Sequence, residues 1–305
     1  MKNLKCKVIH SDSEFTESLE KKIQENSLPV EIIGQNETDE NYLILDFKKN
    51  PTDEIKALLS KKDKETILFI SEDKDSELSE LLKKYPVQHV LRDEDDNKLN
   101  LITDILNTNI NNEYWSLQKI LGQSTQIQET LFKKSSDVNP LIEKFVESVD
   151  LSNAFKEIPT YLTQTVNELV TNAMFNAPVD GDGKAKYRSM DKRKNLDLLP
   201  CEYVTLKYGA SDSVLAFSVR DQFGSLNKET IYQYLSRGLQ EIIRHEDKDG
   251  GAGLGLALIR QFCHRLIFNI SPGNFTEVIC YIDKMKRFKL HQTHVKSIHV
   301  FFQKG

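Results

Sequence analysis

The chain has 305 residues, with 39% hydrophobic and 29% charged side chains and a formal net charge of −5, which favours about two globular domains and gives no general signature of nucleic-acid binding. No apolar run approaches the ~20 residues that a membrane-spanning helix needs, and the first residues lack the apolar core of a signal peptide. The four cysteines are scattered without metal-site or disulfide spacing, so we expect a cytoplasmic protein that binds neither nucleic acid nor a membrane.

The N-terminal third alternates short apolar strands with amphipathic helices. Residues 1–110 carry 16 Lys and Arg against 24 Asp and Glu, a net charge of −8, whereas the remainder carries +3; this step favours two domains with different roles. Five strands alternating with helices predict a doubly wound parallel sheet in a domain of residues 1–108. The expected strands are 6–10, 30–33, 42–47, 66–70 and 87–91, and the expected helices are 14–26, 51–59, 76–84 and 99–106.

Polar residues follow several of these strands, at the edge where doubly wound sheets bind ligands. They are Asp12, Asp46, Ser71 and Arg92. The pattern resembles the receiver domain of two-component response regulators, a flavodoxin-like fold, and the resemblance implies that Asp46 is a phospho-acceptor with Ser71 as its neighbouring hydroxyl. The family's magnesium-binding acidic pair is reduced to Ser11-Asp12, which weakens metal binding, and Arg92 stands where the family has lysine. Two interpretations remain, a degenerate receiver used for docking, which we favour, and a working phospho-acceptor.

Residues 109–150 predict a mostly helical connector. Apolar stripes begin at Trp115 and restart after Pro140. The segment would serve as a coiled connector, a dimer interface or packing for the second domain, and we favour packing. No histidine lies between His89 and His245, so this region offers no phospho-accepting histidine.

A helix expected over 161–177 carries two separate faces. Its apolar residues recur at helical spacing and predict a buried side, whereas Glu168, Asn172 and Asn176 step by four along another side. An acid and two amides in line suit a metal and a water together. The plain alternative is a solvated polar face.

The rest of the chain contains two glycine-bearing turns. A strand expected over 214–219 runs into Asp221, with Gly224 three residues later, and a glycine-rich stretch, Gly250 to Gly255, precedes an apolar helical pattern. Glycine lets backbone N–H groups turn toward an anion, and a helix N-terminus favours phosphate, so the second turn is a candidate phosphate cradle. The basic loop 179–200 is either solvated or steers phosphates. The other expected strands are 203–208, 266–270, 276–283 and 294–302, with a helix over 227–238.

The order of these motifs resembles the GHKL ATPase superfamily over residues 151–305, which implies a C-terminal α/β sandwich with a mixed or antiparallel sheet. The resemblance implies ATP and Mg²⁺ as cofactors. It makes Glu168 the general base or water-orienting acid and Asn172 the magnesium ligand, with Asp221 accepting a hydrogen bond from the adenine amino group. The remaining cofactor-binding positions that it implies are Asn176, Gly224, Gly251, Gly253, Leu254, Gly255 and Thr276. The chain departs from the family at Phe223, where a glycine is usual, and at Asn176, which is often basic.

The expected function is that of a signalling protein kinase of the serine/threonine switch type. It would transfer phosphate from Mg-ATP to a partner protein, such as an anti-sigma-antagonist-like protein or another phospho-acceptor, and the receiver-like domain would regulate or dock; a homodimer is one expected arrangement. A histidine kinase acting in trans and a nucleotide-sensing module with little catalysis remain alternatives. A mechanochemical ATPase is the least favoured.

Overall fold

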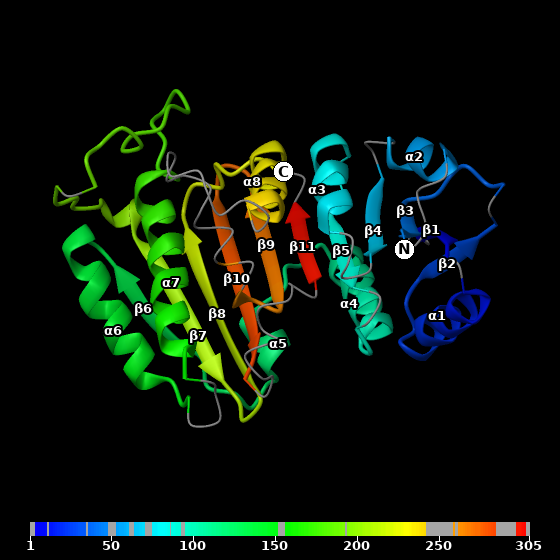
Figure 1. Cartoon of the computed structure of the whole chain (residues 1–305), viewed down its shortest axis with the longest axis horizontal. Coiled ribbons are helices and arrows are strands. Elements are labelled where there is room, and N and C mark those ends of the chain that lie inside the picture. The colour runs from blue at the N-terminus through cyan, green and yellow to red at the C-terminus, as the bar shows by residue number, and fades with distance from the viewer. Residues whose placement is uncertain are drawn as a thin grey trace. The chain divides into compact units, whose positions relative to one another are not determined.

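The computed structural model describes residues 4–10, 12–34, 36–47, 53–60, 64–70, 75–85, 87–92, 95–151, 156–192, 194–241, 259, 262–284 and 297–302. The fold is mixed α/β, with strands β1–β11 and helices α1–α8 in these residues. The chain divides into two compact units, Met1–Tyr114 with Lys296–His299 and Trp115–Val295 with Val300–Gly305 (Figure 1). Within the described residues, no helix is long and apolar enough to cross a membrane.

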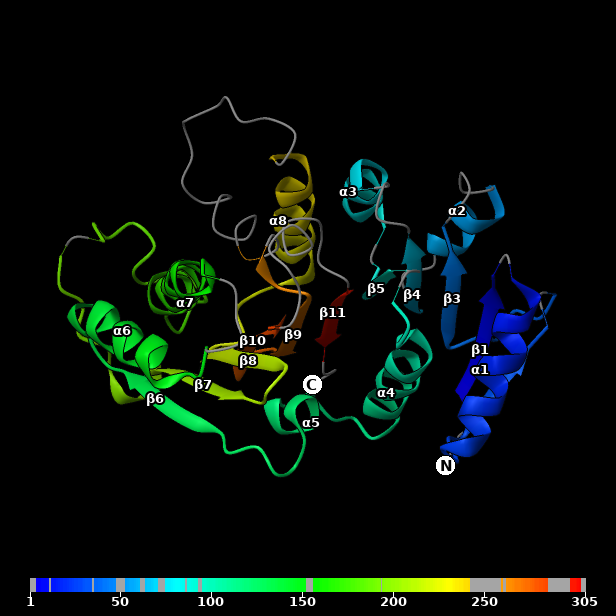
Figure 2. The same cartoon turned by 60° about the horizontal axis from the view of Figure 1, so that its bottom comes forward.

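Five parallel strands form the sheet of the first unit, in the order β2-β1-β3-β4-β5. This is a common order of doubly wound sheets, and Figure 2 shows α2 and α3 on one side of the strands and α1 and α4 on the other. Strands β3, β4 and β5 are buried almost throughout, as expected when helices cover both faces. The expected parallel sheet is therefore present. Its elements are β1 Leu4–Ile9, α1 Ser13–Glu25, β2 Val30–Ile33, β3 Tyr42–Asp46, α2 Asp53–Leu59, β4 Glu65–Ile70, α3 Asp75–Lys84, β5 His89–Arg92 and α4 Lys98–Ile110.

A strand from the far end of the chain also joins this unit. The first residues of β11 (Ser297–Phe302) pair antiparallel with β5, with Ser297 opposite Leu91 and His299 opposite His89. The strand expected over 294–302 is thus present. Its place beside the N-terminal sheet could not be expected from the sequence, because the pattern of a strand carries no information on its partner.

The connection between β2 and β3 is unusually short. The two strands flank β1 and are parallel, and such crossovers usually take a dozen or more residues and a helix. Here residues 34–41 suffice, and the described part of this segment contains no helix. It lies along β1, where Asn41 donates its backbone N–H to the Lys5 carbonyl and accepts the Lys5 N–H through its side chain.

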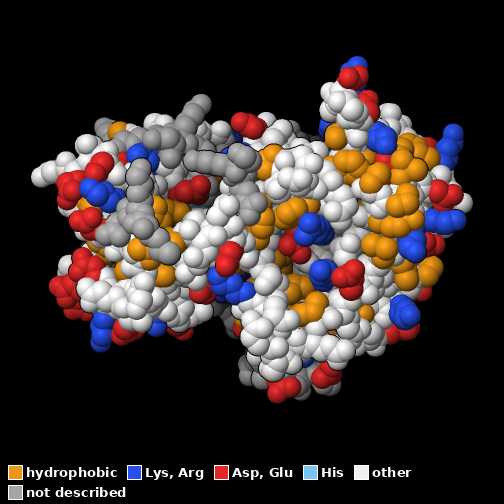
Figure 3. Space-filling model, turned by 180° about the vertical axis from the view of Figure 1, so that it is seen from behind, with side chains coloured by type: hydrophobic (Ala, Val, Ile, Leu, Met, Phe, Trp, Pro, Cys, Tyr) orange, Lys and Arg blue, Asp and Glu red, His pale blue; other side chains and the backbone are white. Residues whose placement is uncertain are grey.

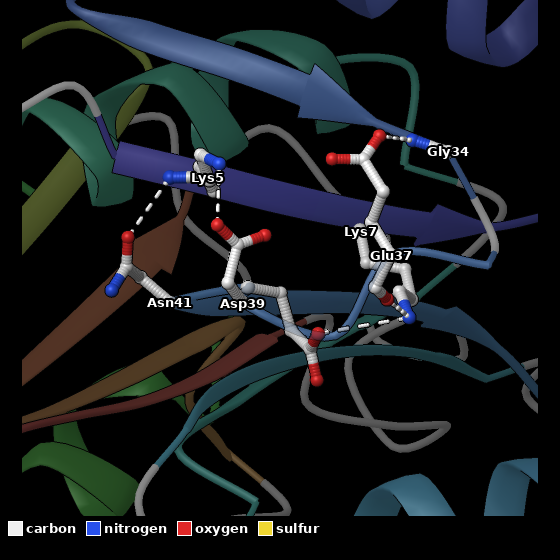
Figure 4. Close-up of polar contacts among 7 residues, drawn as sticks. Lys5, Lys7, Gly34, Glu37, Asp39 and Asn41 are labelled. Atoms are coloured by element: carbon white, nitrogen blue, oxygen red, sulfur yellow. Dashed lines mark hydrogen bonds and ion pairs between the residues drawn. The ribbon is translucent and has the colours of Figure 1, made fainter.

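Two lysines of β1 hold this connection (Figure 4). Lys5 forms an ion pair with Asp39 at the surface. Lys7 donates to the backbone carbonyl of Glu37 and lies 3.6 Å from the Glu40 carboxylate, with side-chain exposures of 5% for Lys7 and 0% for Glu40. A buried charge is tolerated only when it is paired. Because the partners of Lys7 lie in the short connection, Lys7 holds this connection against β1.

Replacing Lys7 tests this role. Lys7→Met removes the buried ammonium that faces Glu40, so we expect the free energy of unfolding of the first unit to fall by about 3–5 kcal/mol. Lys5→Met is the matched control, since its ion pair is exposed and surface pairs contribute little. Urea unfolding read by hydrogen exchange in β1 measures both; equal effects of the two substitutions would contradict the assignment.

The second unit contains an antiparallel sheet in the order β9-β10-β8-β7-β6. On one face, Phe145 of α6 packs its ring against Tyr208 and Phe217, which are register partners on β7 and β8. Helix α7 packs on the same two strands and on α6. On the other face, α5 packs on β7 and β8 (Figure 2). The elements are α5 Leu117–Leu121, β6 Gln128–Phe132, α6 Val138–Ser148, α7 Ile158–Phe175, β7 Val204–Ala210, β8 Val214–Asp221, α8 Lys228–Glu241, β9 Arg265–Ser271 and β10 Phe275–Asp283.

One part of the expected connector is wrong. Residues 128–132 are not helical but form the edge strand β6, which pairs antiparallel with β7. The helix after Pro140 is present as α6, and Phe132, Ile142 and Phe145 are buried. This segment packs within the second unit, as the favoured interpretation held.

Candidate functional site

Helix α7 carries the three polar residues of interest in one hydrogen-bonded row. The amide of Asn176 donates to Asn172 Oδ1 at 2.7 Å, and the amide of Asn172 donates to Glu168 Oε1 at 2.9 Å. Glu168 and Asn172 are half-buried and Asn176 is exposed. The opposite side of the helix, including Leu162, Val166 and Val170, is buried. The spacing by four therefore produces a continuous polar row, which we call the α7 ladder.

A second polar pair lies where β8 and β10 meet. Asp221 ends β8 and stands opposite Thr276 in the antiparallel register, with exposed fractions of 6% and 4%. Asp221 Oδ1 accepts the backbone N–H of Phe223 at 2.8 Å and of Gly224 at 3.3 Å. The structure thus brings together two expected site residues that lie 55 positions apart in the sequence.

Burial raises the pKa of the Asp221 carboxyl above its usual range. The backbone N–H groups of Phe223 and Gly224 oppose this effect without cancelling it. When ionised, a carboxylate offers about four lone-pair positions, and two N–H groups of the turn occupy one oxygen. Asp221 is therefore a desolvated acceptor suited to an N–H donor from a ligand.

The turn after Asp221 is fixed from two sides. Gly224 has φ +57°, and a Cβ at this position would lie 2.0 Å from the carbonyl oxygen of Ser271, the last residue of β9. Ser225 donates its hydroxyl to the carbonyl of Ala177, just past the end of α7, at 2.9 Å. This bond joins the Asp221 turn to the C-terminal end of the α7 ladder. Ser225 is not among the site residues expected from the sequence, because its role depends on this tertiary contact alone.

The basic loop after α7 is anchored by a buried acid. Glu202, with an exposed side-chain fraction of 1%, pairs with Lys186 and accepts the Tyr187 hydroxyl at 3.0 Å and the Leu199 N–H at 3.0 Å. Burial works to raise the pKa of the Glu202 carboxyl, but Lys186 and these donors outweigh it and lower the pKa. All four lysines, Lys184, Lys186, Lys192 and Lys194, are exposed, and Lys186 is held by its ion pair with Glu202.

The candidate phosphate cradle lies outside the described residues. This applies to Gly251, Gly253, Leu254 and Gly255 and to the polar segment 242–250. Their expected roles stay predictions from the sequence.

The donors of α7 are compatible with a magnesium ion. Among the described residues, no group of three His, Cys, Asp or Glu side chains is arranged to hold a metal. Magnesium in nucleotide sites needs fewer, since one or two protein oxygens combine with phosphates and waters. Asn172 Oδ1 and the neighbouring Glu168 carboxylate supply such hard oxygen donors.

The strand ends of the first unit are filled by packed side chains. Asp46 is 7% exposed, and its carboxylate lies 3.9 Å from His10 Nε2. The His10 ring stacks on Phe15 with centroids 4.0 Å apart and meets Phe69 edge-on. His10, which sequence reasoning missed, therefore occupies the position beside Asp46.

The other expected receiver residues are used differently or are not described. Asp12 accepts the Glu14 N–H at 2.9 Å and thereby caps α1. Arg92 is 2% exposed at the end of β5. Ser11 and Ser71 lie outside the described residues.

No protein-family model matches the chain, and no curated protein matches it significantly.

The close approach of Gly224 to Ser271 gives a stability prediction. Gly224→Ala adds both left-handed strain and a steric clash with Ser271, and we expect a loss of about 3 kcal/mol or more in the free energy of unfolding. Gly273→Ala is the matched control, because Gly273 also has a left-handed φ of +74° but no neighbour within 4 Å of an added Cβ; it should lose only about 1 kcal/mol. The single tryptophan, Trp115, belongs to this unit and is 3% exposed, so its fluorescence reports the unfolding. Equal losses of stability in the two variants would show that the close approach to Ser271 does not determine the cost of Gly224→Ala.

Proposed function

We propose that the second unit binds Mg-ATP between α7 and the β8–β10 pair, and that the protein is a GHKL-type protein kinase of the serine/threonine switch class. The observation that carries this proposal is the joining of the α7 ladder to the Asp221–Thr276 pair through the Ser225–Ala177 hydrogen bond. A nucleotide site of this class requires a carboxylate at the adenine end and oxygen donors for a metal ion at the phosphate end.

Each residue has a defined task in this proposal. Asp221 accepts the adenine amino group, which selects adenine over guanine, and Thr276 supports the carboxylate. Asn172 holds the metal, which when bound neutralises charge on the phosphates. Glu168 orients or deprotonates the acceptor hydroxyl of a partner protein. The glycine-rich stretch 250–255 contacts the phosphates through its backbone.

The first unit is proposed to be a receiver-like docking or regulatory domain. The strand order β2-β1-β3-β4-β5 supports the flavodoxin-like class. The low exposure of Asp46 and the neighbouring His10 ring favour docking over phosphoryl acceptance, because an attacking carboxylate must reach its donor.

A second function, a nucleotide sensor with little catalysis, is supported by one observation. The amide group of Asn172 is hydrogen-bonded on both sides within the α7 ladder, and the position of Asn176 carries no positive charge for a phosphate. Incubation with γ-labelled ATP and Mg²⁺, with and without candidate partner proteins, separates the two. Label on a partner as an alkali-labile ester supports the kinase, an acid-labile product the trans-histidine kinase, and binding without transfer the sensor.

Glu168 is expected to act on turnover and not on binding. Glu168→Gln preserves an acceptor for the Asn172 amide but removes the base, so ATP turnover or transfer should fall by about 10²- to 10⁴-fold while ATP affinity changes little. Asn167→Ala, on the same helix but off the ladder, is the control and should retain activity. Steady-state turnover and equilibrium ATP binding measure the two effects. Full turnover in Glu168→Gln would exclude the proposed role.

We expect Asp221 to lower the stability of the folded protein at neutral pH and to be required for ATP binding. Since burial raises its pKa in the folded state, the wild-type protein loses stability as the pH rises from the ordinary carboxyl pKa of about 4 through the higher folded value. Asp221→Asn removes this cost, so the variant should be more stable than wild type at neutral pH and lose that advantage below about pH 4, while ATP binding is abolished. Thr276→Val is the control, because the Thr276 hydroxyl is buried without a hydrogen-bond partner among the described residues, so its loss should change stability at neutral pH much less than Asp221→Asn does. Thermal unfolding across pH tests both; a destabilised Asp221→Asn at neutral pH would contradict the argument.

A further inference from the structure

Within the part of the chain that the structure describes, β6 is an edge strand of the second unit's sheet. Among the described residues, β7 is its only strand neighbour. An unpaired strand edge offers a row of backbone N–H and C=O groups and serves as a template for another strand unless it is protected.

The side chains of β6 show which face is exposed. Phe132 is 0% exposed on the helix-covered face, whereas Leu131, on the opposite face, is 38% exposed. Glu129 and Lys133 share the face of Leu131 by the two-residue period of a strand, and both are exposed. Figure 3 views the molecule from the side opposite that of Figure 1, and hydrophobic side chains are exposed over the sheet of the second unit.

We propose that β6 pairs antiparallel with β6 of a second copy of this chain, centred on Leu131, to form a two-fold symmetric dimer. In this register Leu131 faces Leu131 of the other copy, and Glu129 faces Lys133 on both sides of the axis. Shifting the centre to Glu129 or to Lys133 places like charges opposite each other, and centring on Thr130 or Phe132 opposes Leu131 with a charged residue. Only the Leu131 register makes this face complementary to itself, as a symmetric interface requires.

The contacts that Glu129 and Lys133 make within one copy are weak enough for both side chains to pair with a second copy. Glu129 lies 3.4 Å from Lys207, but the two side chains are 57% and 44% exposed, and such surface pairs contribute little. Lys133 lies over the Tyr203 ring at 5.6 Å, on the same exposed face. This surface is independent of the nucleotide site.

Charge reversal gives the first test. Glu129→Lys alone and Lys133→Glu alone each place like charges across the axis, so self-association of the full chain should weaken roughly tenfold or more. An equimolar mixture of the two variants restores opposite charges at both contacts, and it should dimerise as wild type does. Analytical ultracentrifugation over a concentration series measures all three. A wild-type chain that stays monomeric, or a mixture no tighter than its components, would overturn the proposal.

Disulfide trapping tests the register. In a Cys201→Ser background, which removes the exposed native thiol, Leu131→Cys should crosslink the dimer, because directly opposed residues are about 4.5–5.5 Å apart. Glu129→Cys is the control and should not crosslink, since its copies are four residues out of alignment. Crosslinking of Glu129→Cys without crosslinking of Leu131→Cys would reject the Leu131 register.

Discussion

A carboxylate buried at the end of β8 is the constraint around which the candidate site is arranged. Removing Asp221 from water costs free energy unless donors face it, and the nearest donors are the N–H groups of its own turn. A turn tight enough to aim them back brings Gly224 against the Ser271 carbonyl, where a side chain does not fit. Burial of the Asp221 carboxylate therefore explains the sequence Asp-x-x-Gly, without reference to any ligand.

The candidate polar residues of the two units lie in contrasting environments. In the first unit, Asp12 caps a helix, and Asp46 is buried with its carboxylate 3.9 Å from His10 Nε2. In the second unit, Glu168 and Asn172 are half-buried and form a row along one helix. Chemistry on a ligand requires groups that can exchange partners, which is why the proposal assigns it to the second unit.

The sequence predicted the buried strands well because parallel central strands are continuous apolar runs, as in β3 and β4. It failed at β6, where an exposed edge strand carries Gln, Glu and Thr and lacks a clear alternation. It also missed the buried Lys7, since a lysine in a strand ordinarily indicates a solvent-facing position and only the short crossover explains its burial. At the site, helical spacing was enough for the α7 ladder, whereas Ser225 depends on tertiary contact alone.

The hydrogen bonds of the α7 ladder also determine whether Asn172 can bind a metal ion. Asn172 donates toward Glu168 and accepts from Asn176, so its neighbours fix which end of the amide is oxygen. A carbonyl oxygen has two lone pairs, and one remains when Asn176 occupies the other. The amide therefore need not rotate to coordinate a cation, and the side-chain entropy of positioning it is lost on folding and not on binding. On this argument Asn176, although it lacks the usual positive charge, acts by orienting Asn172 and not by contacting phosphate.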